Sequence, residues 1–273
     1  MTITVLGCGW LGFPLAERLA GRNYRVKGSA RSEKKVKLLN QNSIDGYRIE
    51  LPDSFQDESA ELFWNSEILF LNIPPSGSGN PETYPRLMER AARTFMESGD
   101  QENKWVIFAS STSVYSDTGG LTIEEDVVSE TLAGLRGQMM LRAELAVRGV
   151  QKEATILRLG GLYGYGRHPI YSLSGRTGLK DPQKPVHLIH QKDCLNIITK
   201  VVEKKLKGET YNLISDGHPP RKTFYQHAAK FYNLPLPQFL DEPEKDYRIL
   251  SNRKIKEQLG YTFTYPNPMD LTP

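Results

Sequence analysis

The sequence predicts an α/β fold in which a doubly wound parallel sheet is accompanied by a smaller C-terminal lobe. Two observations predict this fold class. Short apolar, β-branched segments alternate with longer segments of helical periodicity, as they do in successive βαβ units. The first short segment also runs directly into three glycines, in "TITVLGCGWLG", a spacing that is typical of the strand-to-helix turn of a Rossmann-type domain.

The strands of the first half follow from short runs of apolar and β-branched residues. We expect them at Ile3–Leu6, Tyr24–Gly28, Ile68–Ile73, Trp105–Ala109 and Ala154–Leu159, with a weaker one near Tyr47–Leu51.

The helices between these strands follow from periodicity and from capping residues. The first carries the apolar positions Leu11, Leu15 and Leu19 and ends at Gly21. The second has Asn80 as its N-cap and Pro81 in its first turn, and it ends just before Gly99. A third runs from about Glu130 to Arg148.

After Gly164 the sequence becomes rich in glycine, proline and basic residues, which indicates a loop region or the start of a smaller lobe. We then expect a strand in "VHLIH", a helix over about Asp193–Lys205, a strand in "TYNLI", and helices near Thr223–Tyr232 and Asn252–Leu259. The predicted organisation is a nucleotide-binding domain in residues 1–164 and a smaller substrate-binding lobe in residues 165–273, of which residues 186–215 return to the sheet.

The composition is that of an ordinary globular protein, with 38% hydrophobic and 25% charged residues in a chain of 273. Its 35 basic and 32 acidic residues are too balanced to indicate a nucleic-acid partner. No apolar run approaches the roughly 18–20 residues of a membrane span, and the first strand leaves no room for a signal peptide. Cys8 and Cys194 form no disulfide or zinc pattern. We expect a cytoplasmic protein that is a monomer or a homodimer and has no membrane partner.

The glycine spacing predicts a site for a dinucleotide. Gly7 permits a tight turn, Gly9 lets the backbone approach the pyrophosphate, and Gly12 allows the helix to pack closely on the strand. Trp10 and Leu11 would lie along the diphosphate. The alternative is a glycine-rich turn that holds no ligand.

The second strand indicates which dinucleotide is bound. A site for NAD places an acidic residue about 20 positions beyond the glycines, but no acidic residue occurs from Arg18 to Ser32. Arg31 and Ser32 stand at the strand end, where an arginine accommodates a 2′-phosphate. We therefore predict NADP, with NAD as the less favoured cofactor. The alternatives are that Arg31 only stacks on adenine or that these residues begin a solvated helix.

Further motifs extend along nearly the whole chain: "VIFASSTSVYS", "LRLGGLYGYGR", "HLIHQKDC", "YNLISDGHPPRKTFYQHAAKFYNLP" and "LSNRKIKEQLGY". Together they resemble the short-chain dehydrogenases/reductases, in particular the extended branch of sugar-nucleotide epimerases and dehydratases. The resemblance implies a Rossmann-type fold with a substrate lobe.

The resemblance also implies roles for individual residues. Ser111 stands where the family keeps its catalytic Ser/Thr, with Ser110 beside it as a cofactor contact. The segment "FLNIPPSG" resembles an NAD(P)-binding subgroup in which Ile73, Pro74 and Pro75 would line the cofactor groove. Alternatively, the two prolines only end the strand and begin a turn.

The chain departs from the family at its catalytic tyrosine and lysine. When the glutamate that follows this pair in the family is aligned with Glu144, Arg136 stands at the tyrosine position and Met140 at the lysine position. Met140 supplies neither charge nor a hydrogen-bond donor. The chain in this respect resembles the atypical subgroups that keep the cofactor fold without the usual pair.

Two other tyrosines are candidates for proton transfer. Tyr115 and Tyr163 follow the fifth and sixth strands of the family pattern, at the carboxyl edge where ligands bind in such sheets. With a pKa near ~10, either one would need a nearby cation such as Arg136 to act as a base at neutral pH. The alternative is that both pack in the interior with their hydroxyls in structural hydrogen bonds.

His187, His190 and Asp193 raise the question of a metal site. The two histidines lie three residues apart in a strand-like run, so they would face opposite sides of a strand. We therefore expect no metal, and the resemblance implies an organising role between the lobes for His190 and Asp193.

We interpret the chain as an NADP-dependent oxidoreductase or epimerase-like enzyme that acts on a small carbonyl or hydroxyl substrate. The loop that carries Arg167, His168, Arg176 and Lys180 would suit an anionic substrate, and the alternative, which is more common for scattered charges, is a solvated loop. The alternative is a non-catalytic protein that senses NADP, which the missing Tyr-Lys pair favours. A dehydrogenase of the ketopantoate-reductase type is a third hypothesis, and "SSTSVYS" argues against it.

Overall fold

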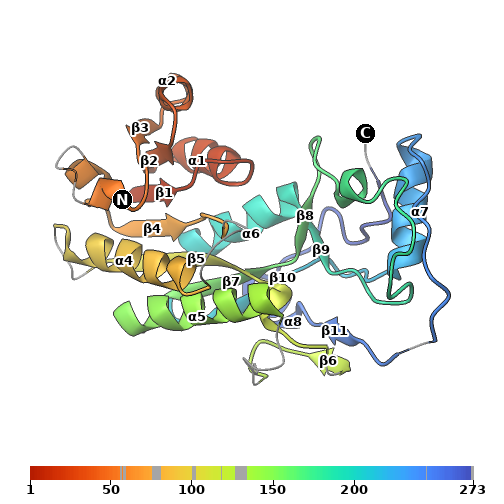
Figure 1. Cartoon of the computed structure of the whole chain (residues 1–273). Helices are drawn as coiled ribbons and strands as arrows, with labels where there is room; N and C mark the ends of the chain where they lie inside the picture. The colour runs from red at the N-terminus through yellow and green to blue at the C-terminus, as the bar shows by residue number, and fades with distance from the viewer. Residues whose placement is uncertain are drawn as a thin grey trace. The chain divides into compact units, whose positions relative to one another are not determined.

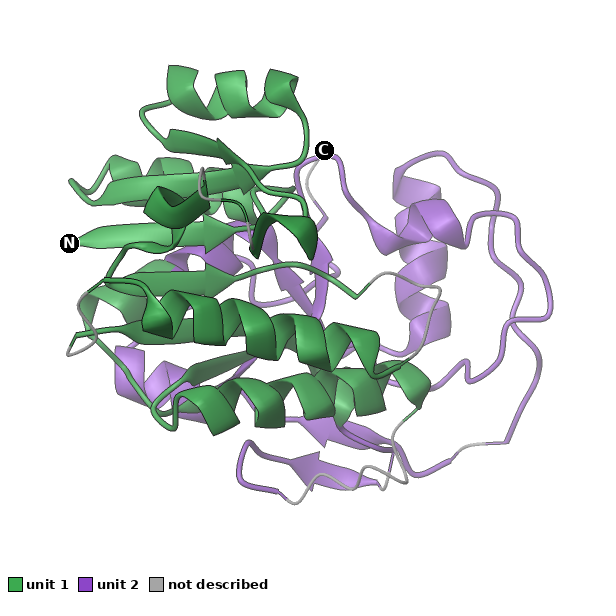
Figure 2. Cartoon of the chain, turned by 60° about the vertical axis from the view of Figure 1, so that its left-hand side comes forward, with its two compact units in different colours: residues 1–114, 133–157, 199–210 green, residues 115–132, 158–198, 211–273 purple. Residues whose placement is uncertain are grey.

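The computed structural model describes residues 1–55, 57, 60–75, 81–99, 103–117, 119–126, 134–243 and 245–271, and Figure 1 shows their elements. These residues form two compact units, coloured separately in Figure 2. The first comprises residues 1–114, 133–157 and 199–210, and the second comprises residues 115–132, 158–198 and 211–273.

The central sheet has seven strands in the order β10-β7-β5-β4-β1-β2-β3, which confirms the predicted α/β fold. Its strands are β1 (Thr2–Leu6), β2 (Arg25–Ala30), β3 (Asp45–Arg48), β4 (Ile68–Leu71), β5 (Trp105–Ser111), β7 (Thr155–Leu159) and β10 (Thr210–Leu213). The five strand-like segments predicted in the first half, and the weaker one, all lie at these strands within a few residues.

The helices of the first unit are α1 (Gly12–Ala20), α2 (Glu33–Gln41), the short α3 (Glu61–Trp64), α4 (Thr83–Glu97) and α5 (Leu135–Val150). The sequence predicts α1, α4 and α5, whereas it predicts neither α2 nor α3. The N-cap of α4 is Glu82, so Pro81 precedes the helix, whereas the predicted cap Asn80 lies outside the described residues. The predicted start of α5 near Glu130 also lies outside them.

Strand β1 lies inside the sheet, and its residues from Ile3 to Leu6 are buried toward both faces, as is typical of an interior parallel strand. It pairs in parallel with β2 on one side and with β4 on the other. Val5 lies opposite Gly28 of β2 and Phe70 of β4. The carboxyl ends of the three strands therefore meet beside the glycine turn that follows β1.

Helices α4 and α5 pack against each other in the first unit (Figure 2). The buried face of α4 recurs at three- and four-residue spacing, with Met88, Ala91, Ala92 and Phe95 all inaccessible. Its first turn contributes Tyr84, which is 5% exposed. This packing fixes the start of α4 near the end of β4.

The second unit contains short parallel pairs and helices. Strand β6 (Gly120–Thr122) pairs with β11 (Arg248–Leu250), and β8 (Gly161–Tyr163) pairs with β9 (Leu188–His190). The helices are α7 (Arg221–Phe231) and α8 (Arg253–Leu259), together with most of α6 (Gln191–Glu203). Tyr163, Val186, Leu188 and Phe224 form one of its apolar clusters. No helix of the described residues is long and apolar enough to cross a membrane.

Candidate functional site

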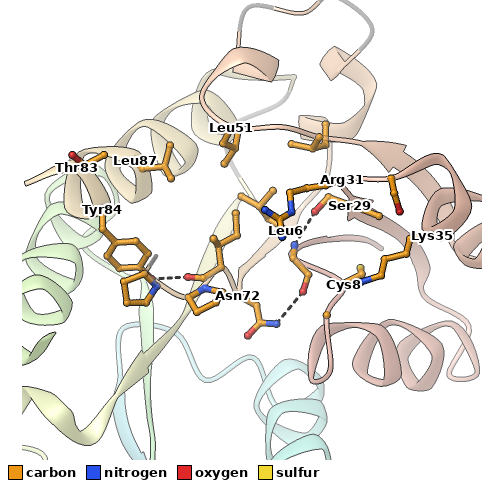
Figure 3. Close-up of a pocket in the computed structure, with 18 of the residues that line it drawn as sticks. Leu6, Cys8, Ser29, Arg31, Lys35, Leu51, Asn72, Thr83, Tyr84 and Leu87 are labelled. Atoms are coloured by element: carbon orange, nitrogen blue, oxygen red, sulfur yellow. Dashed lines mark hydrogen bonds between the residues drawn. The ribbon is translucent and has the colours of Figure 1, made fainter. Parts of the chain in front are cut away.

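A cavity of about 760 Å³ lies in the first unit where β1, β2 and β4 end. Figure 3 shows Tyr84 and Leu87 of α4 on one side of it and Arg31 and Lys35 on the other, with Asn72 between them. Of the residues predicted to bind the cofactor, seven line the cavity: Gly7, Gly9, Arg31, Ser32, Ile73, Pro74 and Pro75. The carboxyl ends of parallel strands are where such sheets bind ligands.

The turn after β1 requires glycine at its first position. Gly7 has φ +106°, and a Cβ there would lie 2.6 Å from the carbonyl oxygen of Asn72. The Gly7 N–H donates to Ser29 Oγ at 2.8 Å, and Asn72 Nδ2 donates to the Gly7 carbonyl at 3.0 Å. The turn is thus tied to both neighbouring strands.

The other two glycines differ in the space around them. A Cβ on Gly12 would lie 2.2 Å from the Gly7 carbonyl oxygen, so α1 packs on the turn only with glycine at this position. A Cβ on Gly9 would meet nothing within 4 Å, although Gly9 lines the cavity. The backbone at Gly9 therefore leaves open the space that a side chain would occupy.

One end of the cavity is basic. Arg31 and Ser32 follow β2, and Lys35 reaches the cavity from α2. Ser29 lines the same end but accepts the hydrogen bond from Gly7. Among the described residues, no Asp or Glu lines the cavity. This end thus favours an anionic group over a neutral hydroxyl.

The opposite side of the cavity is mostly apolar. Ile73, Pro74 and Pro75 line it as the chain leaves β4, and Met139 contributes from α5. The Tyr84 hydroxyl donates to the Ile73 carbonyl at 2.7 Å. Burial raises the pKa of Tyr84 well above its ordinary value, although the charge of Arg136 acts in the opposite direction. Tyr84 therefore holds the proline segment rather than acting as a base.

The remaining residues that the sequence predicts as cofactor contacts do not line this cavity. Trp10, Leu11 and Gly12 lie at the start of α1, outside the lining. Ser110, 3% exposed, donates its hydroxyl to the buried carboxylate of Glu144. That bond links β5 to α5, which is a structural arrangement.

Ser111 is the last residue of β5 and is partly buried. Its Oγ accepts a hydrogen bond from the Ser113 N–H at 3.2 Å. It belongs to the first unit but does not line the cavity. A role for Ser111 in binding the reacting oxygen stays a prediction.

Tyr115 belongs to the second unit and is 5% exposed. Its hydroxyl donates to Asn212 Oδ1 at 2.9 Å and accepts from Arg158 at 2.7 Å. Burial raises the pKa of Tyr115 despite the Arg158 charge. These contacts favour the alternative of a structural tyrosine.

Tyr163 also belongs to the second unit and is 3% exposed. Its hydroxyl is buried and has no hydrogen-bond partner among the described residues. Burial raises the pKa of Tyr163, and the negative charges of Asp193 and Asp270 raise it further. The phenol therefore stays protonated near neutral pH and serves as a donor rather than as a base.

Helix α5 carries the two positions at which the resemblance expects tyrosine and lysine. Arg136 is exposed in the first turn, and Met140 is 2% exposed. Neither lines the cavity, whereas Met139 does. The α5 helix therefore presents no acid or base to the cavity among the described residues.

Asn72, Tyr84, Lys35 and Met139 line the cavity without having been predicted from the sequence. Lys35 could have been found, since it is a cation only four residues beyond Arg31. Asn72 and Tyr84 act through contacts to Gly7 and to the proline segment that no local pattern in the sequence encodes.

The remaining candidates have structural roles. Burial raises the pKa of Cys8 to about 12, so it remains a thiol, and it lines the cavity. Asp193 is fully buried and accepts hydrogen bonds from the Tyr261 hydroxyl and from the N–H groups of Thr264 and Tyr265. It therefore anchors the C-terminal segment of the second unit.

Known proteins resemble the chain in sequence and in fold. No known family model matches the chain. Protein YeeZ of Escherichia coli (strain K12) is 29% identical over 272 residues, which cover 98% of this chain and 97% of that protein.

Solved structures share the fold at low identity. The UDP-glucuronic acid 4-epimerase of Bacillus cereus in complex with NAD aligns with a TM-score of 0.80 at 18% identity, over 99% of this chain and 95% of that chain. A short-chain dehydrogenase/reductase superfamily protein of Agrobacterium tumefaciens with bound NAD aligns with a TM-score of 0.75 at 16% identity, over 99% and 95%. The likenesses confirm, at the level of the fold, the resemblance to the short-chain dehydrogenases/reductases.

Proposed function

We propose that this protein binds NADP(H) in the cavity of its first unit and uses it as an oxidoreductase or epimerase-like enzyme on a small carbonyl or hydroxyl substrate. The observation that carries the proposal is the basic end of the cavity, which Arg31, Ser32 and Lys35 line. No acidic side chain of the described residues lines the cavity. A ribose 2′-phosphate is the part of NADP that such a set would bind.

The residues present fit a dinucleotide. The cavity volume of about 760 Å³ lies within the roughly 300–1,000 Å³ of ligand sites. The open space at Gly9 would admit the pyrophosphate, and the start of α1 would offer it N–H groups. Pro74 and Pro75 would supply an apolar surface with no backbone donors. The relatives of this fold named above contain NAD in their structures, which supports a nicotinamide dinucleotide here.

When bound, the cofactor would supply hydride transfer. This chain would then contribute binding and orientation through the glycine turn, and Ser111 would bind the reacting oxygen of the substrate.

A protein that senses NADP without turnover is the second candidate. It is favoured by α5, whose Arg136 and Met140 stand where a tyrosine and a lysine would act. A second observation favours it. Tyr84 is the one tyrosine among the described cavity residues, and its hydroxyl already donates to the Ile73 carbonyl.

Binding of NADPH and NADH to the purified chain, followed by nucleotide fluorescence, tests the cofactor assignment. Arg31→Ala should weaken NADPH binding roughly tenfold or more, because a hydrogen bond to a charged group is lost, and should change NADH binding by less than about threefold. Lys34→Ala is the matched control, since Lys34 does not line the cavity. Equal losses for both nucleotides would contradict a 2′-phosphate site.

Turnover distinguishes the enzyme from the sensor. NADPH oxidation with a panel of aldehydes and ketones should be measurable for the wild type and should fall roughly a hundredfold in Ser111→Ala. Tight NADPH binding with no oxidation across the panel would instead support the sensor.

A further inference from the structure

Arg136 is a cation for which the described part of the first unit provides no partner. It is the second residue of α5 and is exposed. No hydrogen bond or ion pair joins its side chain to another described residue. The first turn of a helix disfavours a positive charge, because the helix dipole has its positive end there. Stability therefore gives no reason for an arginine at this position.

Arg136 stands on the face of α5 that reaches the dinucleotide cavity. Met139 follows it at a spacing of three residues and lines the cavity, and side chains at this spacing are neighbours on a helix surface. Helical side chains lean toward the N-terminus of their helix, so that of Arg136 extends from Met139 toward the start of α5. Arg136 does not itself line the cavity. It therefore lies at the edge of the cavity, beyond Met139.

A second observation relates Arg136 to the apolar side of the cavity. Tyr84 belongs to this side, and its hydroxyl donates to the Ile73 carbonyl at 2.7 Å. Burial raises the pKa of Tyr84, and Arg136 is near enough for its charge to lower it. Helices α4 and α5, which carry Tyr84 and Arg136 in their first turns, pack against each other.

No carboxylate of the described residues pairs with Arg136. The first turn of α5 contains no acidic residue, and no Asp or Glu of the described residues lines the cavity. Glu82, which precedes α4, forms an ion pair with Arg142. The apolar side of the cavity therefore has an uncompensated positive charge at its edge.

The proposed function determines what would lie beside this charge, and the inference rests on it in this respect. If the basic end at Arg31 and Lys35 binds the 2′-phosphate, the nicotinamide lies at the opposite end of the dinucleotide, beside Ile73 and the prolines. A substrate that exchanges a hydride with the nicotinamide must lie on the same side. The group nearest to Arg136 would thus belong to the substrate and not to the adenosine half of the cofactor.

The chemistry of a guanidinium selects the kind of group. Its planar fork carries only N–H donors and keeps its charge at any pH that the protein survives. It matches the oxygen atoms of a carboxylate or a phosphate, with which it forms paired, charge-assisted hydrogen bonds. A neutral carbonyl or hydroxyl would accept a weaker bond and would leave the charge uncompensated.

We propose that Arg136 binds an anionic group of the substrate. The substrate class is then a small carbonyl or hydroxyl compound that also carries a carboxylate or a phosphate. Its reacting carbon faces the nicotinamide on the side of Ile73, and its anionic group faces the start of α5.

The methyl signal of Met139 reports binding at this side of the cavity. The chain has six methionines, so the full-length protein labelled with ¹³C-methyl methionine gives few signals, and that of Met139 is identified by its absence in Met139→Leu. NADP⁺ is added first and should shift this signal. The oxidised cofactor has no hydride to give to a carbonyl, so substrate binding is then followed without turnover.

Pyruvate and pyruvamide distinguish an anionic substrate from a neutral one, because they have nearly the same shape and differ in charge. In the NADP⁺ complex pyruvate should shift the Met139 signal saturably, and pyruvamide should bind at least roughly fivefold more weakly. Dihydroxyacetone phosphate identifies the anion: tighter binding than that of pyruvate assigns a phosphate, and weaker binding assigns a carboxylate.

Arg136→Gln should weaken pyruvate binding roughly tenfold, because a hydrogen bond between charged groups is lost. It should change pyruvamide binding by less than about twofold. Arg136→Lys keeps the charge and should retain pyruvate binding within about threefold of the wild type. Arg93→Gln is the matched control, since Arg93 is an exposed arginine of the neighbouring helix α4 that is paired with Glu89 and does not line the cavity. Its pyruvate affinity should stay within about twofold of the wild type.

The outcomes separate this inference from the proposed function. If NADP⁺ binds to the wild type, the inference is overturned by pyruvamide binding as tightly as pyruvate, by unchanged pyruvate binding in Arg136→Gln, or by equal losses in Arg136→Gln and Arg93→Gln. If NADP⁺ neither binds nor shifts the Met139 signal, the proposed function fails and the inference fails with it.

Discussion

The glycines of the turn after β1 have separable roles at the scale of single residues. Gly7 and Gly12 are required by the fold, because a Cβ on either one would overlap backbone oxygen atoms at 2.6 Å and 2.2 Å. Gly9 is free of such neighbours. A side chain at Gly9 would therefore compete with a ligand without disturbing the turn.

Gly12→Ala should consequently affect stability, whereas Gly9→Val should affect cofactor binding. Gly12→Ala should lower the free energy of unfolding by about 2 kcal/mol or more, as overpacking does. Gly9→Val should leave that free energy within about 1 kcal/mol of the wild type and weaken NADPH binding roughly tenfold or more. Urea unfolding and fluorescence titration of both variants measure the two effects. A Gly9→Val variant that binds NADPH as the wild type does would contradict the proposed place of the pyrophosphate.

The sequence predicts a candidate site residue best when the residue acts through its own backbone or stands next to a strand end. Gly7, Gly9, Arg31 and Ser32 are of this kind, and all four line the cavity. Tyr84 is different, since it meets Ile73 only because α4 packs where it does. Such a contact depends on tertiary packing and has no local signal.

At the scale of elements, the start of α4 and the end of β4 are joined by one hydrogen bond. Pro74 and Pro75 have no N–H, so the segment after β4 has few donors with which to fix itself. The Tyr84 hydroxyl supplies one from outside, at 2.7 Å from the Ile73 carbonyl. The apolar side of the cavity therefore depends on a residue of α4.

Tyr84→Phe should lower the free energy of unfolding by about 1 kcal/mol, because one hydrogen bond is lost while the ring remains. It should also weaken NADPH binding several-fold, since the proline segment is less well held. Leu87→Ile is a suitable control on the same helix face, because it lines the cavity without a polar group. Urea unfolding and NADPH titration provide the readouts. If Tyr84→Phe changes neither the free energy of unfolding nor the NADPH affinity, this hydrogen bond does not position the proline segment.

The elements themselves were predictable where periodicity extends over several residues. The strands β1, β4, β5 and β7 carry apolar runs, and α1 carries a stripe of leucines. The strands β6, β8 and β11 have three residues each, which is too short for an alternating pattern to show. They form only because distant segments of the second unit supply their partners.

At the scale of the whole molecule, two buried histidines make stability depend on pH. Burial lowers the pKa of His168 to about 4, and burial together with the nearby charges of His218, Arg248 and Lys184 lowers that of His187 to about 3. The ordinary value is 6.5. Below pH 6.5 the unfolded chain therefore binds protons that the folded chain does not.

With respect to these two histidines, the free energy of unfolding is therefore highest above pH 6.5 and decreases as the pH falls toward 4. At about pH 5 each of the two histidines should cost roughly 2 kcal/mol of unfolding free energy relative to neutral pH. Urea unfolding at about pH 7.5 and about pH 5 measures the drop. The Ile170 N–H donates to His168 Nδ1 at 3.1 Å. His168→Asn keeps an acceptor for it and should reduce the drop by roughly 2 kcal/mol. If the decrease in unfolding free energy is as large in this variant as in the wild type, other groups are responsible for it.

The chain passes between its two units five times, since the six segments alternate between them. Residues 199–210 complete the first unit, long after the glycine turn near its beginning. Ribosomes add roughly 5–20 residues per second, so on the order of ten seconds separates the synthesis of the turn from that of the last segment of its unit. Throughout that interval the first unit is incomplete, because its last segment has not yet been synthesised. The glycine turn is made first, and within its unit it therefore waits longest for the last segment to be synthesised.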